Sequence, residues 1–212
     1  MSLRNKKILI TAGPTWVSID NTRVISNIAS GQTGILLAEE LRELGAIVTL
    51  ILGPAEACCL NKNIRLLRFK FFEELKKLIV GELKAGKYDI LIHSAAVSDY
   101  RPAVVSSRKI KSDKKKLKID LFPTPKIIDL VKKIDKSVIL VGFKFEPGAE
   151  KSALLKKAKA LMSRSHSDLV VANTIRNNHY QAYIMDKQKA CGPFSDKKDM
   201  IRKLIIACGE RL

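Results

Sequence analysis

A long segment of small and polar residues follows the first apolar run of the chain and could hold an anion. It spans residues 12–34 and contains, in order, Gly13-Pro14-Thr15, Asp20, Arg23, Asn27 and Ser30-Gly31-Gln32-Thr33-Gly34. The last five residues stand where a helix is expected to begin, and such a start offers free N–H groups and the positive end of the helix dipole. Loops this long inside a compact domain are commonly functional. We therefore predict that the working site is built around this loop.

A second group of candidate residues follows a later apolar run that ends at His93. It reads Ser94-Ala95-Ala96-Val97-Ser98-Asp99-Tyr100-Arg101-Pro102. Small residues let a ring or a phosphate approach the backbone, and Asp99 could accept hydrogen bonds from an amino group. In open α/β sheets the loops at the carboxyl ends of the strands converge on one crevice, so this group is expected beside the first. Ordinary strand exits have similar composition, and neither group alone identifies a ligand.

Two familiar nucleotide motifs and a metal motif are missing from the sequence. The first strand is followed by Gly-Pro-Thr instead of the dinucleotide fingerprint, and no Gly-Lys-Ser/Thr occurs. A nicotinamide dehydrogenase and a P-loop ATPase are therefore disfavoured. The four cysteines show no CxxC spacing, so we expect them to be reduced and structural; they are Cys58, Cys59, Cys191 and Cys208.

Apolar runs alternate with segments of helical periodicity along most of the chain. Strands are expected near 6–11, 46–52, 64–69, 88–93, 137–143 and 168–172, and helices near 31–44, 72–83, 125–134, 148–162 and 197–208. This alternation is typical of a parallel sheet covered on both faces. Residues 180–185 and 189–194 are expected to form an antiparallel hairpin on one edge. We predict an α/β fold, Rossmann-like and doubly wound with a mostly parallel sheet, in one domain spanning 1–212.

The segment 106–122 departs from this pattern because charged and apolar residues alternate in it around a charged turn. Period-two alternation indicates a β-hairpin. We expect a protruding β-arm here, as a mobile flap or an oligomerisation ribbon.

Composition narrows the class of protein. A chain of 212 residues with 46% apolar residues can fill one core, and it has neither an apolar run long enough for a membrane helix nor an apolar signal region, so a cytoplasmic protein without a membrane partner is expected. The net charge of +18 divides into +3 for residues 1–100 and +15 for residues 101–212. Such a bias favours an anionic partner, either nucleic acid or a phosphorylated small molecule. A lysine-rich composition without functional meaning would give the same charge.

Taken together, the motifs are far more specific. Gly-Pro-Thr-x₄-Asp-x-x-Arg-x-Ile-Ser-Asn-x-x-Ser-Gly-x-x-Gly, Ala-Ala-Val-x-Asp-Tyr-Arg, Lys-Ile-Lys, Gly-Phe-Lys-Phe-Glu and Val-Ala-Asn resemble the phosphopantothenoylcysteine synthetase (phosphopantothenate–cysteine ligase) family of coenzyme A biosynthesis, from about Lys6 to Leu204. The resemblance implies a carbon–nitrogen ligase. A nucleoside triphosphate, CTP in most bacteria, would activate the carboxylate of 4′-phosphopantothenate as an acyl-nucleotide with loss of pyrophosphate, and the amine of L-cysteine would then attack.

The resemblance also implies a form without the flavin-dependent decarboxylase domain to which many bacteria fuse this enzyme. Mg²⁺ would bridge the triphosphate, but its ligands stay unknown because no carboxylate cluster marks them. A homodimer is implied, in which 106–122 reaches toward the partner's site.

Catalytic and substrate-binding roles carry over by similarity. Asn27 would hold the activated acyl group, Arg23 would support that loop or the substrate, and Lys109 would meet the triphosphate, where a cation offsets the charge on departing pyrophosphate. The phosphopantothenate cradle would comprise Asn27, Ser30, Gly31, Gly34 and Ala96.

The nucleotide pocket would be lined by residues from several loops, with Asp99 reading the amino edge of the base and Phe143 packing on it. The full set is Ser94, Ala95, Asp99, Lys109, Pro125, Lys126, Ile127, Ile128, Phe143 and Lys159.

Three departures from the family pattern leave the nucleotide open. Thr124-Pro125-Lys126 stands where many relatives carry an acid as the third residue. Lys159 is the better match for the first of two helix lysines, and the second falls near Arg164. The Phe-Lys-Phe-Glu at 143–146 is closer to eukaryote-like members, some of which use ATP, so CTP and ATP both remain.

Two other classes of function would fit parts of the sequence. A basic nucleic-acid-binding α/β module would explain the charge, but the arm has only Tyr100 and Phe122 at its edges for stacking bases, so we expect no nucleic-acid partner. A nicotinamide-dependent reductase of similar fold is the other alternative, because fold alone does not fix function.

Overall fold

An eight-stranded sheet forms the centre of the computed structural model, which describes residues 3–55, 61–113 and 115–212. The spatial order is β12-β11-β10-β9-β6-β1-β4-β5. Six strands are parallel, namely β1 (Lys7–Ala12), β4 (Ile47–Leu52), β5 (Arg65–Arg68), β6 (Ile90–His93), β9 (Ile139–Phe145) and β10 (Leu169–Arg176). The hairpin β11 (His179–Met185) and β12 (Ala190–Phe194) adds antiparallel strands at one edge. Numbered along the chain, the parallel strands have the order 3-2-1-4-5-6 of a Rossmann sheet, which confirms the predicted fold class.

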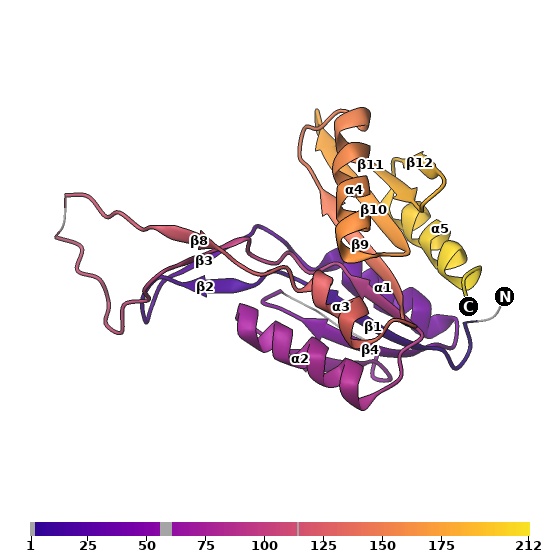
Figure 1. Cartoon of the computed structure of the whole chain (residues 1–212), viewed down its shortest axis with the longest axis horizontal. Coiled ribbons are helices and arrows are strands. Elements are labelled where there is room, and N and C mark those ends of the chain that lie inside the picture. Colours follow the sequence, from indigo (N-terminus) through magenta and orange to yellow (C-terminus); the bar gives the residue numbers. More distant parts are fainter. Residues whose placement is uncertain (1–2, 56–60, 114) are drawn as a thin grey trace.

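In the described part of the chain, five helices cover the two faces of this sheet (Figure 1). One core cluster joins α1 (Gln32–Glu43) and α5 (Lys197–Gly209) to one face. The other joins α2 (Phe72–Ala85), α3 (Ile128–Ile134) and α4 (Lys151–Ser165) to the opposite face. Neighbouring strand residues alternate between the clusters, with Ile8 and Ile10 in the first and Leu9 in the second. No helix in the part of the chain that the structure describes is long and apolar enough to cross a membrane.

An arm extends from the carboxyl edge of the sheet, at the left in Figure 1. Its base contains the antiparallel pairs β2 (Trp16–Ser18) with β3 (Val24–Ser26) and β7 (Tyr100–Pro102) with β8 (Leu121–Pro123). The β2–β3 hairpin lies inside the segment 12–34 that we expected to be a loop.

The extent of the predicted hairpin over 106–122 was wrong. Strand pairing is confined to the arm's base, and residues 103–113 and 115–120 form no strand. Alternation stabilises a strand when its apolar face is buried, whereas Val104 and Leu117 in the arm are 82% and 47% exposed. The arm protrudes as predicted, but its outer part is irregular.

Candidate active site

The candidate site lies where β1 and β6 are neighbours at the centre of the sheet. The connection after β1 leads to α1 on one face and the connection after β6 leads to α3 on the other, and ligands bind at such switch points. Beyond the strand ends the two loops run side by side. The N–H of Thr15 donates to the carbonyl of Ala96 at 3.2 Å, and the N–H of Ala96 donates to Gly13 at 2.9 Å. The two groups singled out in the sequence therefore form one structural unit.

Asn27 is fixed on top of this unit. Its Nδ2 donates to the carbonyls of Ala96 and Val97, each at 3.2 Å, although the residue is exposed. The hydroxyl of the preceding Ser26 donates to the carbonyl of Thr15 at 3.3 Å. An amide side chain is thus held beside the carboxyl ends of β1 and β6 by the loop that follows β6.

Buried hydroxyls that we did not predict as site residues hold the second loop. The N–H of Ser98 donates to Oγ1 of Thr15 at 2.8 Å, and Oγ1 of Thr124 donates to the carbonyl of Ser98 at 2.6 Å. All three residues are at most 5% exposed. Thr15 and Ser98 belong to the quoted motifs, but their spacing of 83 residues gave no sign that they would pair.

His93 lies below the loops as a buried support. Its Nδ1 is 2.8 Å from Oγ1 of Thr11 on the neighbouring strand. Burial lowers the pKa of His93 to about 4, so its imidazole is neutral near pH 7. Ser94 continues this contact, because its hydroxyl donates to the carbonyl of Thr11 at 2.7 Å. These groups fix the floor of the crevice.

Asp99 and Lys126 form an ion pair at the edge of the crevice. Their side chains are 65% and 39% exposed, so the pair is accessible to a ligand. Ile127 and Ile128 after it are in the hydrophobic core, which leaves only their backbone groups for contact with a nucleotide. Pro125 is exposed. Lys126, the residue that departs from the family pattern, therefore neutralises the predicted base-reading acid.

Phe143 and Lys159 have different positions relative to the crevice. Gly142 is in register with His93, so Phe143 lies one residue beyond it at the carboxyl end of β9 and is half-buried. Lys159 instead lies in the second half of α4 and lines a separate cavity with Met185 and Asp186. Those residues are at the amino edge of the sheet, because β11 runs antiparallel to β10. The structure therefore does not bring Lys159 to the crevice, and Arg164 lies further along the same helix, where it pairs with Asp129 at 3.0 Å.

The two predicted glycines at the start of α1 serve different needs. Gly31 has φ +71° and is the N-cap of the helix, a conformation that favours glycine, and Ser30 beside it is exposed. Gly34 is buried, and a Cβ there would be 2.4 Å from Cβ of Ala12 and 2.9 Å from Oγ of Ser94. The absent side chain of Gly34 thus allows the helix to pack against β1.

Arg23 links the first loop to the arm. Its Nη1 donates to Oδ2 of Asp20 at 2.7 Å and to the carbonyl of Ile110 at 3.1 Å. The side chain of Asp20 is buried and also accepts the N–H of Ile110 at 3.0 Å, which holds the pKa of this carboxyl far below its usual range. Lys109 is exposed next to this anchor. Asp20, part of the motif but not predicted as a site residue, is the acceptor that ties the two segments together.

Asn173 is a further candidate site residue that we did not predict from the sequence. It lies at the carboxyl half of β10, opposite Phe145 of β9, and ends the Val-Ala-Asn motif. Its Oδ1 is buried and has no hydrogen-bond partner within the described residues. A buried acceptor without a partner is costly, and this one is available to a donor from a ligand.

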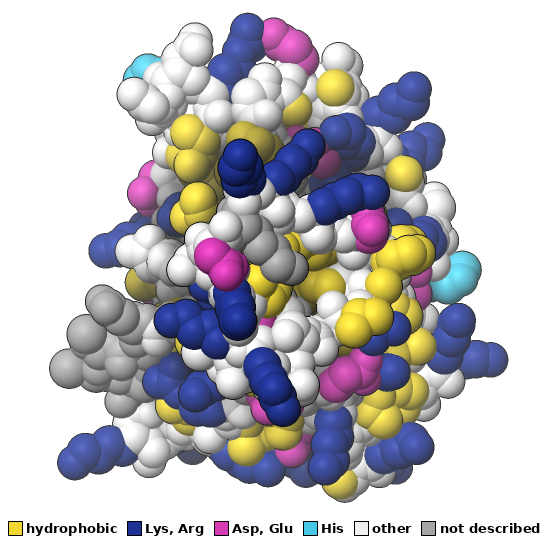
Figure 2. Space-filling view, turned by 90° about the vertical axis from the view of Figure 1, so that its left-hand side faces the viewer, with side chains coloured by type: hydrophobic (Ala, Val, Ile, Leu, Met, Phe, Trp, Pro, Cys, Tyr) yellow, Lys and Arg dark blue, Asp and Glu magenta, His cyan; other side chains and the backbone are white. Residues whose placement is uncertain are grey.

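The described parts of the chain contain no group of three or more His, Cys, Asp or Glu side chains that could hold a metal ion. Of the four cysteines, Cys191 and Cys208 are free thiols, while Cys58 and Cys59 lie outside the described residues. Figure 2 looks onto the end of the molecule that carries the arm and shows Lys and Arg side chains spread over it, with few Asp and Glu and with apolar side chains between them. This face suits an anionic ligand with apolar parts.

Known proteins of one family are similar to nearly the whole chain. Residues 3–207 match the family model described as the DNA/pantothenate metabolism flavoprotein C-terminal domain (DFP). The chain belongs to this family. It is 43% identical over 175 residues, which are 82% of this chain and 43% of the relative, to the "Coenzyme A biosynthesis bifunctional protein CoaBC" of Thermococcus kodakarensis. It is 32% identical over 217 residues, 96% of this chain and 59% of the relative, to a "Cysteine/Cysteine sulfinic acid decarboxylase" of an unknown prokaryotic organism.

A solved structure of a DNA/pantothenate metabolism flavoprotein from Streptococcus pneumoniae superposes with a TM-score of 0.87 at 26% identity, covering 98% of this chain and all of that one. The predicted family membership is thereby confirmed. The chain spans about half the length of the curated relatives that it matches.

Proposed function

We propose that this chain is a phosphopantothenate–cysteine ligase of coenzyme A biosynthesis. The observation that carries the proposal is the position of Asn27, which is bonded to the backbone of the second loop at the switch point. Membership of the family and the likeness to a CoaBC protein give the class of reaction. The substrates are 4′-phosphopantothenate, L-cysteine and a nucleoside triphosphate with Mg²⁺.

The reaction has two steps, and this chain's own residues have distinct roles in each. A carboxylate oxygen of 4′-phosphopantothenate attacks the α-phosphate of the nucleotide, and the bond to pyrophosphate breaks. Lys109 on the arm offsets the negative charge that builds on pyrophosphate. The cysteine nitrogen then attacks the acyl carbon, the nucleoside monophosphate leaves, and the attacking amine loses a proton. Asn27 holds the acyl group between the steps.

Binding uses both loops and the start of α1. Ser30, Gly31 and Gly34 supply the phosphopantothenate end of the site together with Ala96, and the free N–H groups of α1 favour its phosphate. Ser94, Ala95 and the backbone of 125–128 border the nucleotide, and Phe143 packs on the base. The unpartnered Oδ1 of Asn173 accepts a donor from the bound substrates.

The nucleotide is CTP or ATP, and the base of each carries an exocyclic amino group that can donate a hydrogen bond to the carboxylate of Asp99. Lys126 contacts one oxygen of this carboxylate, so the amino group of a base can share the carboxylate or take the place of Lys126. An exposed ion pair contributes only about 0–1 kcal/mol, so the exchange costs little.

The arm is proposed to complete a partner's site in a homodimer. It projects beyond the sheet and exposes apolar side chains, among them Val104 and Phe122 at 82% and 54%. Exposed apolar groups on a projecting segment favour association with another surface.

The experiment is a product assay by mass spectrometry with 4′-phosphopantothenate, cysteine and Mg²⁺, run separately with CTP and with ATP. The proposal predicts 4′-phosphopantothenoylcysteine with at least one nucleotide and none when nucleotide is omitted. Asn27→Gln is a matched variant, because it keeps the amide but moves it by one methylene, and it should slow product formation strongly. Carbon dioxide released from cysteine without any amide product would contradict the proposal.

A further inference from the structure

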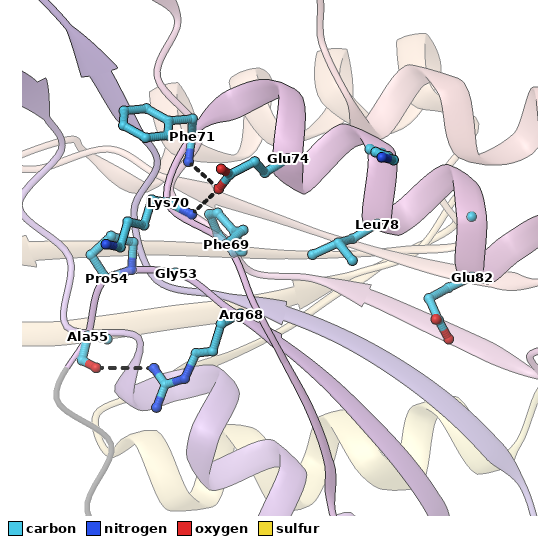
Figure 3. A pocket seen from close by; sticks show the side chains of 12 residues that line it. Gly53, Pro54, Ala55, Arg68, Phe69, Lys70, Phe71, Glu74, Leu78 and Glu82 are labelled. Carbon is cyan, nitrogen blue, oxygen red and sulfur yellow. Dashed lines mark hydrogen bonds between the residues drawn. The ribbon is translucent and has the colours of Figure 1, made fainter. Parts of the chain in front are cut away.

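We propose that the cavity between β5 and α2 is a second ligand site, which binds small organic anions with a flat apolar body. The cavity has a volume of about 980 Å³, within the range of small-molecule sites. It lies at the carboxyl ends of β4 and β5, whereas the candidate active site lies at β1 and β6. Figure 3 shows the side chains that line it. The inference does not depend on the proposed ligase activity.

The apolar part of the ligand would be held by the floor of this cavity. Pro54, Phe69, Phe71 and Leu78 line it from the loop after β4, the loop after β5 and α2. Gly81 on α2 adds free space, because a Cβ built there would have no atom within 4 Å. A planar apolar group therefore has both contact surface and room.

The charge of the ligand follows from which side chains are already occupied. Glu74 accepts the N–H groups of Lys70 at 2.7 Å and Phe71 at 3.1 Å, and these bonds lower the pKa of its carboxyl. Glu82 accepts from Arg65 and from Tyr88, each at 2.5 Å.

The basic side chains of the cavity outnumber its carboxylates, because Arg68, Lys70 and Lys77 line it with Glu74 and Glu82, and Glu82 is already paired with Arg65. Arg68 donates to the carbonyl of Ala55 at 3.4 Å, and Nζ of Lys70 lies 5.9 Å from the centre of the Trp16 ring. Glu74 interacts electrostatically with Lys70, but within the described ranges no carboxylate lies at salt-bridge distance from Arg68, Lys70 or Lys77. Three cations around an apolar floor favour an anionic ligand.

The cavity wall is joined to the loop that carries Asn27. The N–H of Trp16 donates to the carbonyl of Lys70 at 2.7 Å. The Trp16 and Phe71 rings pack edge to face, with 6.4 Å between their ring centres. Trp16 is paired with Ser26, the residue before Asn27. A ligand in the cavity therefore contacts residues that support the candidate active site, and Trp16, the chain's only tryptophan, reports its binding.

The test is a fluorescence titration of the whole chain, without nucleotide or substrates, with 8-anilinonaphthalene-1-sulfonate as the anionic arene. We expect saturable quenching of Trp16 with a rise in dye emission, and weaker binding of the uncharged N-phenyl-1-naphthylamine. Lys77→Gln should weaken binding of the sulfonate about threefold, as expected for one exposed charge contact. Lys76→Gln, the neighbouring residue outside the cavity, should leave it unchanged.

Gly81→Leu fills the free space and should weaken binding at least about tenfold, while leucine suits a helix better than glycine does. A circular dichroism melt checks that each variant is folded, and Lys77→Gln still decides the matter if Gly81→Leu does not fold. Absence of binding to the unaltered protein would overturn the proposal. So would equal affinity of the unaltered protein, Lys77→Gln and every folded Gly81→Leu sample, because the dye would then bind elsewhere.

Discussion

His93 should make the stability of this protein depend on pH in a defined window. The residue is buried below the crevice, and burial lowers its pKa to about 4 from an ordinary value of 6.5. His93 therefore becomes protonated near pH 6.5 in the unfolded chain but only near pH 4 in the folded chain. Stability contributed by neutral His93 is fully present above pH 6.5 and is lost as the pH falls toward 4.

The magnitude follows from these two values. Linkage gives a loss of about 2 kcal/mol between about pH 7.5 and pH 5, since the unfolded imidazole is almost fully protonated at pH 5 and the folded one is about one-tenth protonated. The other histidines of the chain, His166 and His179, are exposed. Carboxylates contribute mainly below this window.

The assay is urea unfolding at pH 7.5, 6.5, 5.5 and 5.0 for the natural chain and for His93→Gln, which keeps a polar group near Thr11 and cannot titrate. We expect the stability difference between the two proteins to change by about 2 kcal/mol across the series, with the natural chain losing more as the pH falls. Parallel curves would refute the reasoning. They would mean that His93 is solvated or that its charged form has a partner in the fold.

Four further substitutions test separate parts of the structure. Gly34→Ala should lower the free energy of unfolding, measured in urea, by about 1–3 kcal/mol because the added Cβ overlaps β1. Gly81→Ala, where the added Cβ meets open space, should raise it by about 0.5–1 kcal/mol. Equal effects would show that helix propensity alone governs both positions. Asn27→Asp should accumulate acyl-nucleotide in quenched-reaction chromatography, and full turnover would remove its assigned role. Asp20→Asn should speed proteolytic cutting of the arm several-fold, since Asp20 anchors Ile110; an unchanged cutting rate would contradict that anchor.

Much of the fold could be predicted because buried parallel strands leave a simple signal. Runs such as Ile8–Ile10 are apolar throughout since both faces of the sheet are covered. The antiparallel hairpin expected from 180–185 and 189–194 is observed as β11–β12. The short strands β2 and β3 were missed because three residues are too few to show a period.

Only the site residues that belong to sequence motifs could be predicted, and their contacts with one another could not. Asn27 and Ala96 were both singled out, but their direct hydrogen bond depends on how two loops 69 residues apart meet. The pairing of Asp99 with Lys126 likewise arises from the entry to α3, and spacing along the chain carries no sign of it. Lys159 was placed by similarity on a helix whose direction carries it away from the crevice.

The most direct test of the central claim is pyrophosphate release by the purified chain given 4′-phosphopantothenate and cysteine, with CTP and ATP in separate reactions. We predict release with at least one nucleotide, one pyrophosphate for each amide formed, and none when 4′-phosphopantothenate is left out. No release with either nucleotide would contradict the claim that the crevice around Asn27 activates a carboxylate.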